Sequence, residues 1–198
     1  MIWMAGFTVI PLLMVFCYGL TDCSGAFTLA NILAISSSEH LKALWLSLAL
    51  AGVSTVICLV LAYPLALILR KRHIGKGSFV VFIFILPMWM NFLLRTMAWQ
   101  TLLEKNGVIN TFLTMLHLPN IAIINTPAAI ILGMVYNFLP FMVLPIYNTL
   151  AKIDDNVINA ARDLGADNYQ TLTKILLPLS VPGIVSGITM VFVPALTT

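Results

Sequence analysis

The chain has 198 residues, of which 61% are hydrophobic and 9% are charged, and its net charge at pH 7 is +3. Soluble domains carry about 25% charged residues, so this composition excludes an ordinary soluble domain and indicates a membrane protein. The basic residues form short clusters at the ends of apolar stretches rather than a stripe, which excludes a nucleic-acid-binding surface. The three cysteines and three histidines are scattered, and no metal site is predicted from them.

Five apolar runs follow one another along the chain and predict membrane-spanning helices, because a helix needs about 20 apolar residues to cross a bilayer. They cover residues 2–20, 43–69, 78–94, 126–150 and 179–198. The first run lacks the basic start of a cleaved signal peptide, so we expect it to be a retained span. The third run stops at Arg95 but can continue through Trp99 if the long Arg95 side chain reaches the membrane surface.

The distribution of basic residues predicts the orientation of these spans. Four Lys or Arg residues lie between the second and third runs, and three lie between the fourth and fifth. Cytoplasmic loops are enriched in Lys and Arg, so these two connections and the N-terminus are predicted to be cytoplasmic. The segments 21–40 and 100–125 are then external. Within the second of them, the apolar residues from Val108 to Leu118 predict a short amphipathic helix at the membrane surface.

The connection after the fourth run is longer than a simple turn requires, and its first half predicts a short helix. Either Asp154 or Asp155 can cap the start of this helix. Gly165 stands where a C-terminal cap is expected, because glycine readily adopts a left-handed conformation. The positions predicted to form its apolar face are Val157, Ile158, Ala161 and Leu164.

The second half of this connection predicts another short helix. Asp167 and Gln170 have the spacing of a capping box at its start. Pro178 is expected to separate this helix from the last span. A solvated connector is the simpler interpretation of the whole connection, but its length, caps and small residues favour a docking element for a cytoplasmic partner.

These residues resemble the EAA loop of ABC-importer permeases, in which Glu-Ala-Ala is followed at fixed spacing by Gly and by Ile-x-Leu-Pro. The residues in register are Ala160, Ala161, Gly165, Ile175, Leu177 and Pro178. The resemblance implies that the first short helix is a coupling helix that docks on an ATPase subunit, with Asn159 and Asp163 also at the contact. Asn159 replaces the glutamate of the family pattern and cannot make its charge-assisted hydrogen bonds, so we expect weakened docking.

Three further segments, 86–110, 133–154 and 191–198, look like spermidine/putrescine-type permeases, one branch of this family. The resemblance implies an all-α fold, a polytopic transmembrane helical bundle with the type I ABC importer permease fold. Five spans are present, and a sixth is expected to be missing. Residues 1–40 would form the first transmembrane helix and an external loop. Residues 41–198 would form the permease domain, truncated at its C-terminus, with a coupling loop at 151–179.

The function implied is that of a permease subunit of an ATP-driven importer in the inner or plasma membrane, with polyamines as the expected solute, rather than that of an enzyme. The implied partners are ABC ATPase subunits, a second permease subunit and an external substrate-binding protein. The chain lacks a phosphate-binding loop, so ATP is expected on the ATPase subunit and no cofactor on this chain. Gly183 and Gly187 form a GxxxG motif that fits pairing with the second permease. The alternatives are another solute, such as iron, sulfate or thiamine, or a truncated membrane protein that does not transport.

A candidate substrate pathway is predicted from polar and aromatic residues of the third and fourth runs. Aromatic faces attract cations, and amide oxygens can accept hydrogen bonds from amines. The alternative is that the aromatic residues anchor the spans at the membrane surface. Arg95 would repel a polycation and is expected to have a structural or gating role. The candidate pathway residues are Trp89, Asn91, Trp99, Tyr136 and Asn137.

Overall fold

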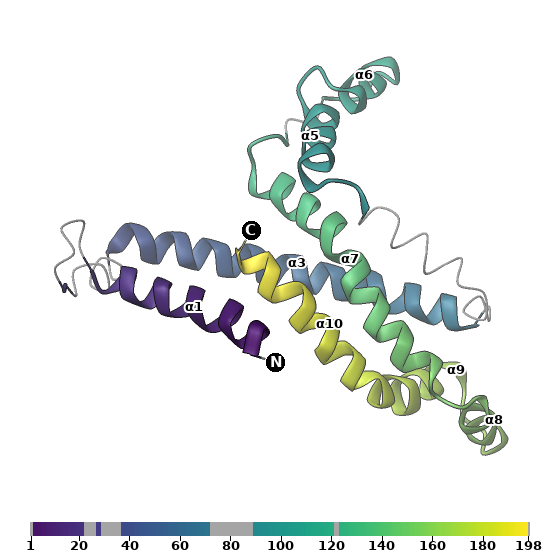
Figure 1. The fold of residues 1–198 in the computed structure, drawn as a ribbon. Helices are drawn as coiled ribbons and strands as arrows, with labels where there is room; N and C mark the ends of the chain where they lie inside the picture. The colour runs from purple at the N-terminus through teal and green to yellow at the C-terminus, as the bar shows by residue number, and fades with distance from the viewer. Residues whose placement is uncertain (1, 22–26, 29–36, 72–88, 121–122, 198) are drawn as a thin grey trace. The chain divides into compact units, whose positions relative to one another are not determined.

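The computed structural model describes residues 2–21, 27–28, 37–71, 89–120 and 123–197, and its regular elements are helices (Figure 1). The chain divides into two compact units, Met1–Leu48 and Ala49–Thr198. In the first unit, α1 (Ile2–Gly19) forms over the first predicted run. It has no acidic residue in its first turn and no basic residue in its last turn, and its retention as a membrane span remains a prediction.

Three helical stretches of the described residues are long and apolar enough to cross a membrane. They coincide with the second, fourth and fifth predicted runs. The first is α3 (Ser38–Lys71), and the second is α7 (Pro127–Ala151). The third, Asn168–Thr197, joins three consecutive elements without a break. These elements are α9 (Asn168–Thr171), η2 (Leu172–Leu176) and α10 (Leu177–Thr197).

Small side chains of α3 pack against larger side chains of α7 and α10. Its buried residues recur every three or four positions and therefore share one face of the helix. They are Ala51, Ser54, Thr55, Cys58, Ala62 and Ala66. The Tyr63 hydroxyl lies 3.2 Å from Ser180 Oγ and joins α3 to α10. The core of the second unit therefore lies between these three helices, with Met142, Ile146 and Leu150 of α7 fully buried within it.

The GxxxG motif of α10 is used within the chain, which corrects the prediction that it pairs with a second subunit. A Cβ atom at Gly183 would lie 2.5 Å from Thr149 Oγ1 and 2.8 Å from the Pro145 carbonyl oxygen of α7. At Gly187 a Cβ atom would lie 2.7 Å from Met142 Sδ. Both glycines are therefore needed for α10 to pack against α7, which runs beside it in Figure 1.

The prediction that Pro178 separates the second short helix from the last span is wrong. Pro178 lies in the first turn of α10, and the chain enters this turn through the π-helical segment η2. The Leu177 N–H donates to the Leu172 carbonyl, five residues back. In a regular α-helix the proline ring would clash with the carbonyl four residues earlier. The wider turn before Pro178 gives the ring room and keeps the helix continuous.

The third predicted run falls largely outside the described residues, which resume at Trp89. Its extension through Trp99 as one helix is wrong, because the helix is interrupted at Met90 and Asn91. A separate helix, α5 (Phe92–Leu103), begins there, and Asn91 Oδ1 caps it by accepting a hydrogen bond of 2.8 Å from the Leu93 N–H.

The helix predicted between Val108 and Leu118 is present as α6 (Val108–Met115). It follows α5 after a short turn, and the buried Asn110 side chain of α6 donates across this turn to the Glu104 carbonyl oxygen. Its location at the membrane surface remains a prediction.

Candidate functional site

The helix predicted in the long connection is α8 (Asp155–Asp163), and its sequence accounts for both of its ends. At the start, Asp154 is the cap: its carboxylate accepts a hydrogen bond of 3.0 Å from the Asn156 N–H. Of the two candidates predicted from the sequence, Asp154 is therefore the capping residue, and Asp155 occupies the first turn. An acidic side chain is favourable there because the N-terminus of a helix carries partial positive charge.

The C-terminal end of α8 is closed by Gly165, which has a positive φ of 85°. The Gly165 N–H donates to the Arg162 carbonyl, and the Ala166 N–H donates to the Ala161 carbonyl. This pair of bonds is a Schellman motif, which satisfies carbonyl groups that the helix would otherwise leave without partners. The predicted glycine cap is thus confirmed, and it fixes the length of α8.

The capping box predicted for the second short helix is also confirmed. The Gln170 N–H donates to Asp167 Oδ1 over 2.6 Å, and Gln170 Oε1 accepts a hydrogen bond of 3.3 Å from the Asp167 N–H. α9 therefore begins at Asn168, directly after the Gly165 turn. Two defined ends, one closing α8 and one opening α9, hold the connection between them in a fixed conformation.

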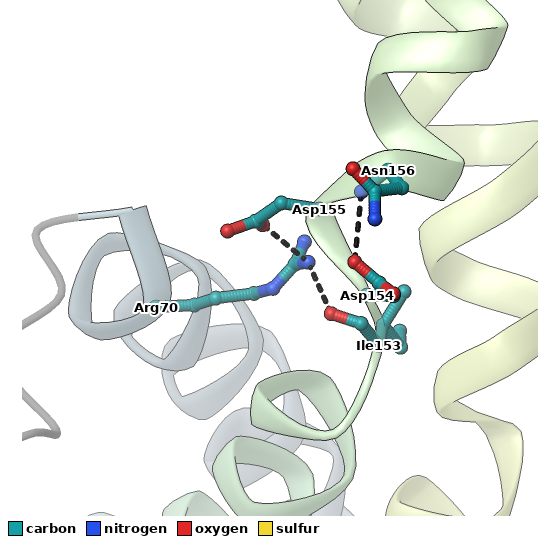
Figure 2. Close-up of polar contacts among 5 residues, drawn as sticks. All are labelled: Arg70, Ile153, Asp154, Asp155 and Asn156. Carbon is teal, nitrogen blue, oxygen red and sulfur yellow. Dashed lines mark hydrogen bonds and ion pairs between the residues drawn. The ribbon is translucent and has the colours of Figure 1, made fainter.

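A long-range contact ties the start of α8 to the end of α3. Arg70, in the last turn of α3, donates from Nη2 to the Ile153 carbonyl oxygen over 2.9 Å and to Asp155 Oδ1 over 3.1 Å (Figure 2). The Arg70 side chain is 11% exposed. From the sequence, Arg70 indicates only the orientation of the spans, and this contact was not predicted. Two features of the sequence could have indicated the contact. An arginine ends one predicted span, and an aspartate begins the short helix that follows a different span.

The sequence predicted that the apolar residues of α8 share one face, but their surroundings in the structure differ. Ala161 is 8% exposed and Ile158 is partly buried, whereas Val157 is exposed and Leu164 is 89% exposed. Val157 and Ala160 of α8 and its C-cap residue Leu164 are spaced three and four residues apart, so they lie on one side of the helix. We call these three residues the outer face of α8. It is apolar, exposed and held on a helix with two defined ends, as a docking surface would be.

The remaining predicted docking residues occupy several places. Asn159 is exposed on a different side of α8, and Asp163 is exposed in its last turn. An aspartate is unfavourable at a helix C-terminus, so Asp163 is not explained by the stability of α8. Ile175 lies in η2 and is partly buried, and Leu177 and Pro178 are exposed at the start of α10. These three residues belong to the span that follows α8 rather than to its outer face.

Two of the predicted pathway residues, Trp99 of α5 and Tyr136 of α7, lie together. Their ring centroids are 5.2 Å apart in an edge-on arrangement, and the Arg95 guanidinium lies 6.0 Å from the centre of the Tyr136 ring. A cation over an aromatic face is attracted by the ring quadrupole. Arg95, Trp99 and Tyr136 therefore form one aromatic–cation cluster between two helices.

The other three pathway residues have different surroundings. Asn137 follows Tyr136 on α7, and its buried Oδ1 atom has no hydrogen-bond partner among the described residues. A buried amide oxygen without a donor is unusual and suggests that a ligand or water supplies one. Asn91 is committed to capping α5, and Trp89 is 76% exposed just before that cap. Neither Trp89 nor Asn91 therefore belongs to the aromatic–cation cluster.

Comparison with known proteins adds the family context. The chain matches the model of the family described as "Binding-protein-dependent transport system inner membrane component" over residues 2–198. It is 36% identical over 203 residues to the spermidine/putrescine transport system permease protein PotB of Haemophilus influenzae, covering 98% of this chain and 71% of that protein. It is 40% identical over 172 residues to the protein of the same name from Escherichia coli, covering 86% of this chain and 62% of that protein.

A solved structure supports the fold independently. The chain superimposes with a TM-score of 0.69 on a chain of the "bacterial alginate ABC transporter in complex with alginate pentasaccharide-bound periplasmic protein", covering 92% of this chain and 68% of that one. At 20% identity this similarity shows the fold alone. The helical architecture and the family match over nearly the full chain agree. The chain belongs to the family of inner membrane components of binding-protein-dependent transport systems.

Proposed function

We propose that the chain is a permease subunit of an ATP-driven importer for polyamines, and that α8 is the helix through which a separate ATPase subunit acts on it. The observation that carries the docking role is the 89% exposure of Leu164 on a helix whose two ends and whose link to α3 are all fixed. An exposed apolar residue on a rigid helix is suited to insertion into a cleft of a partner.

The polyamine assignment follows from the relatives. The two bacterial proteins with 36% and 40% identity are named spermidine/putrescine permeases. The chain spans 62% of the Escherichia coli relative, so the transport activity itself is part of the proposal. By analogy with the family, the chain forms half of a pathway with a second permease. An external binding protein delivers the solute, and the ATPase subunits bind the ATP.

Site-directed crosslinking tests the docking role. We would replace Cys17, Cys23 and Cys58 by serine, introduce Leu164→Cys, and co-express the chain with a polyamine-importer ATPase subunit. A reagent with one thiol-reactive end and one photoactivatable end should then join the two proteins. Ala161→Cys is the matched control, because its side chain is 8% exposed and lies off the outer face. Equal crosslinking from both positions, or none from Leu164→Cys, would refute docking through the outer face.

Uptake of labelled spermidine tests the substrate. The chain would be expressed with its partner subunits in a bacterial strain that lacks its own polyamine importer. Uptake should depend on this chain and should be reduced by excess putrescine but not by sulfate, iron or thiamine. Crosslinking without spermidine uptake would retain the docking role and reject the polyamine assignment.

One observation favours a second candidate, an importer for an anionic solute such as sulfate. Arg95 lies beside the Tyr136 ring, in the place that an ammonium group of a polyamine would take. A fixed positive charge there repels a polycation and attracts an anion. Uptake of labelled sulfate, lost in Arg95→Gln, would establish this candidate in place of the polyamine importer.

A further inference from the structure

The side of α8 opposite the outer face covers a pocket of about 610 Å³. Asp155, Ile158, Asn159 and Arg162 line it from α8, and their spacing of three and four residues places them on one side of the helix. At 100° per residue this side is turned about 180° from the outer face. The other walls come from the last turns of α3 and from α9 and η2. The volume is within the range of about 300–1,000 Å³ that is usual for ligand sites.

The charged residues that line this pocket are predominantly cationic. Arg70, Lys71 and Arg162 line it together with a single carboxylate, that of Asp155. Arg70 already pairs with Asp155 over 3.1 Å. Within the described part of the chain, no ion pair is formed by Lys71 or Arg162, which leaves two positive charges at the pocket. The charge favours an anionic ligand and disfavours a polyamine.

Three of the four apolar residues that line the pocket lie deeper along the spans than the charges. Leu67 precedes Arg70 by about one helical turn in α3, and Leu172 and Leu176 lead from α9 towards α10. Both walls belong to stretches that are long and apolar enough to cross a membrane. The pocket therefore lies where two spans end, with apolar side chains towards the membrane and cations at its polar edge.

We propose that this pocket binds the phosphate headgroup of an anionic phospholipid. The phosphate lies between Lys71 and Arg162, and the acyl chains follow the apolar wall at Leu67. The proposal goes beyond the docking function and shares with it only the cytoplasmic position of α8. A soluble phosphate compound offers the same anionic group but would leave the apolar wall uncovered. Basic pockets at the cytoplasmic ends of spans suit anionic lipid headgroups.

Native mass spectrometry of the purified chain in detergent tests this proposal. The probes are phosphatidylglycerol, phosphatidylcholine with the same acyl chains, and inorganic phosphate. Wild-type chain should retain phosphatidylglycerol in preference to phosphatidylcholine. The double variant Lys71→Gln/Arg162→Gln should lose about fivefold in retention for each charge removed, or about 25-fold in total. The control Lys152→Gln/Lys174→Gln removes the same charge from residues that do not line the pocket and should retain the lipid.

Charge-conserving substitutions separate charge from folding. Lys71→Arg/Arg162→Lys should retain phosphatidylglycerol like wild type. Equal losses in the two glutamine double variants, or equal retention of both lipids by wild type, would overturn the proposal. Displacement of the lipid by millimolar inorganic phosphate would assign the site to a soluble phosphate compound instead. Leu164→Ala should retain phosphatidylglycerol, because Leu164 does not line the pocket and no ATPase subunit is present in this experiment. Failure of the docking role and failure of lipid binding can therefore be distinguished.

Discussion

Arg70 and Asp155, which are 85 residues apart in the chain, meet through an ion pair of 3.1 Å between Nη2 and Oδ1. The same nitrogen donates to the Ile153 carbonyl oxygen over 2.9 Å. Asp155 is 62% exposed, so solvent screens the ion pair and its net contribution to stability is small. The hydrogen bond from the mostly buried guanidinium to Ile153 is the stronger link. Together the two contacts set where α8 starts relative to the end of α3.

Arg70→Gln should therefore lower the free energy of unfolding more than Asp155→Asn does. Loss of a hydrogen bond to a charged donor costs about 1.5–3 kcal/mol, whereas loss of an exposed ion pair costs about 0.2–1 kcal/mol. Unfolding of the purified chain in a denaturing detergent, followed by circular dichroism, measures both. In the assembled importer, Arg70→Gln should also reduce uptake. A larger loss of stability in Asp155→Asn would show that the ion pair, and not the carbonyl contact, fixes α8.

Gly183→Ala should destabilise the packing of α10 on α7. The added Cβ atom would lie 2.5 Å from Thr149 Oγ1 and 2.8 Å from a backbone carbonyl oxygen, so the helices must separate. Overpacking of this kind costs about 1–3 kcal/mol. Gly133→Ala is the control within α7, because no atom lies within 4 Å of its added Cβ. The same detergent titration compares the two variants, and equal stabilities would contradict the close approach at Gly183.

Gly165→Ala should loosen α8 through backbone strain alone. No atom lies within 4 Å of the added Cβ, but the φ of 85° is unfavourable for alanine by about 1–2 kcal/mol. Asparagine tolerates this conformation better than alanine, so Gly165→Asn should destabilise the end of α8 less than Gly165→Ala does. Hydrogen exchange at the amide of Ala166, which donates in the Schellman motif, reports the loosening. Faster exchange in the asparagine variant than in the alanine variant would contradict this explanation.

Leu164→Ala should weaken ATPase docking without affecting the stability of the chain. The side chain is 89% exposed and contributes little to the core. If it inserts into a cleft of the partner, its loss should lower affinity by at least about tenfold, the range of an interface anchor residue. Co-purification with the ATPase subunit measures the affinity, and detergent unfolding measures the stability. A destabilised chain with normal docking would assign Leu164 a structural role.

Asn159→Glu should restore the family's glutamate and strengthen coupling to ATP hydrolysis. The new carboxylate could accept charge-assisted hydrogen bonds from an arginine of the ATPase subunit, which the Asn159 amide cannot do. Position 159 also lines the pocket beside Arg70 and Arg162. The carboxylate would also neutralise part of the positive charge and lower phosphatidylglycerol retention. ATPase activity stimulated by the solute-loaded binding protein, measured in a reconstituted complex, reads out coupling. Unchanged stimulation would reject the idea that Asn159 weakens docking.

Local features of the candidate site were predictable from sequence, and long-range features were not. The caps at Asp154, Gly165 and Asp167 depend on residues only a few positions away, so their spacing was sufficient to predict α8 and α9. Contacts between distant helices leave no such pattern. The partner of Arg70 and the packing of Gly183 on α7 emerged only from the structure. The same is true of the exposure of Leu164, because burial depends on neighbours that the periodicity of one helix does not reveal.

Because Asn168–Thr197 forms one continuous helical stretch, the segment that follows α8 is a rigid helix rather than a flexible linker. Its 30 residues correspond to about 45 Å at 1.5 Å per residue. A tilt of about 10° at its α9 end would displace the opposite end by about 8 Å. If α8 docks on an ATPase subunit as proposed, a small displacement beside α8 would grow with distance along this helical stretch. The wide turn at η2 is the place nearest to α8 where the stretch would bend.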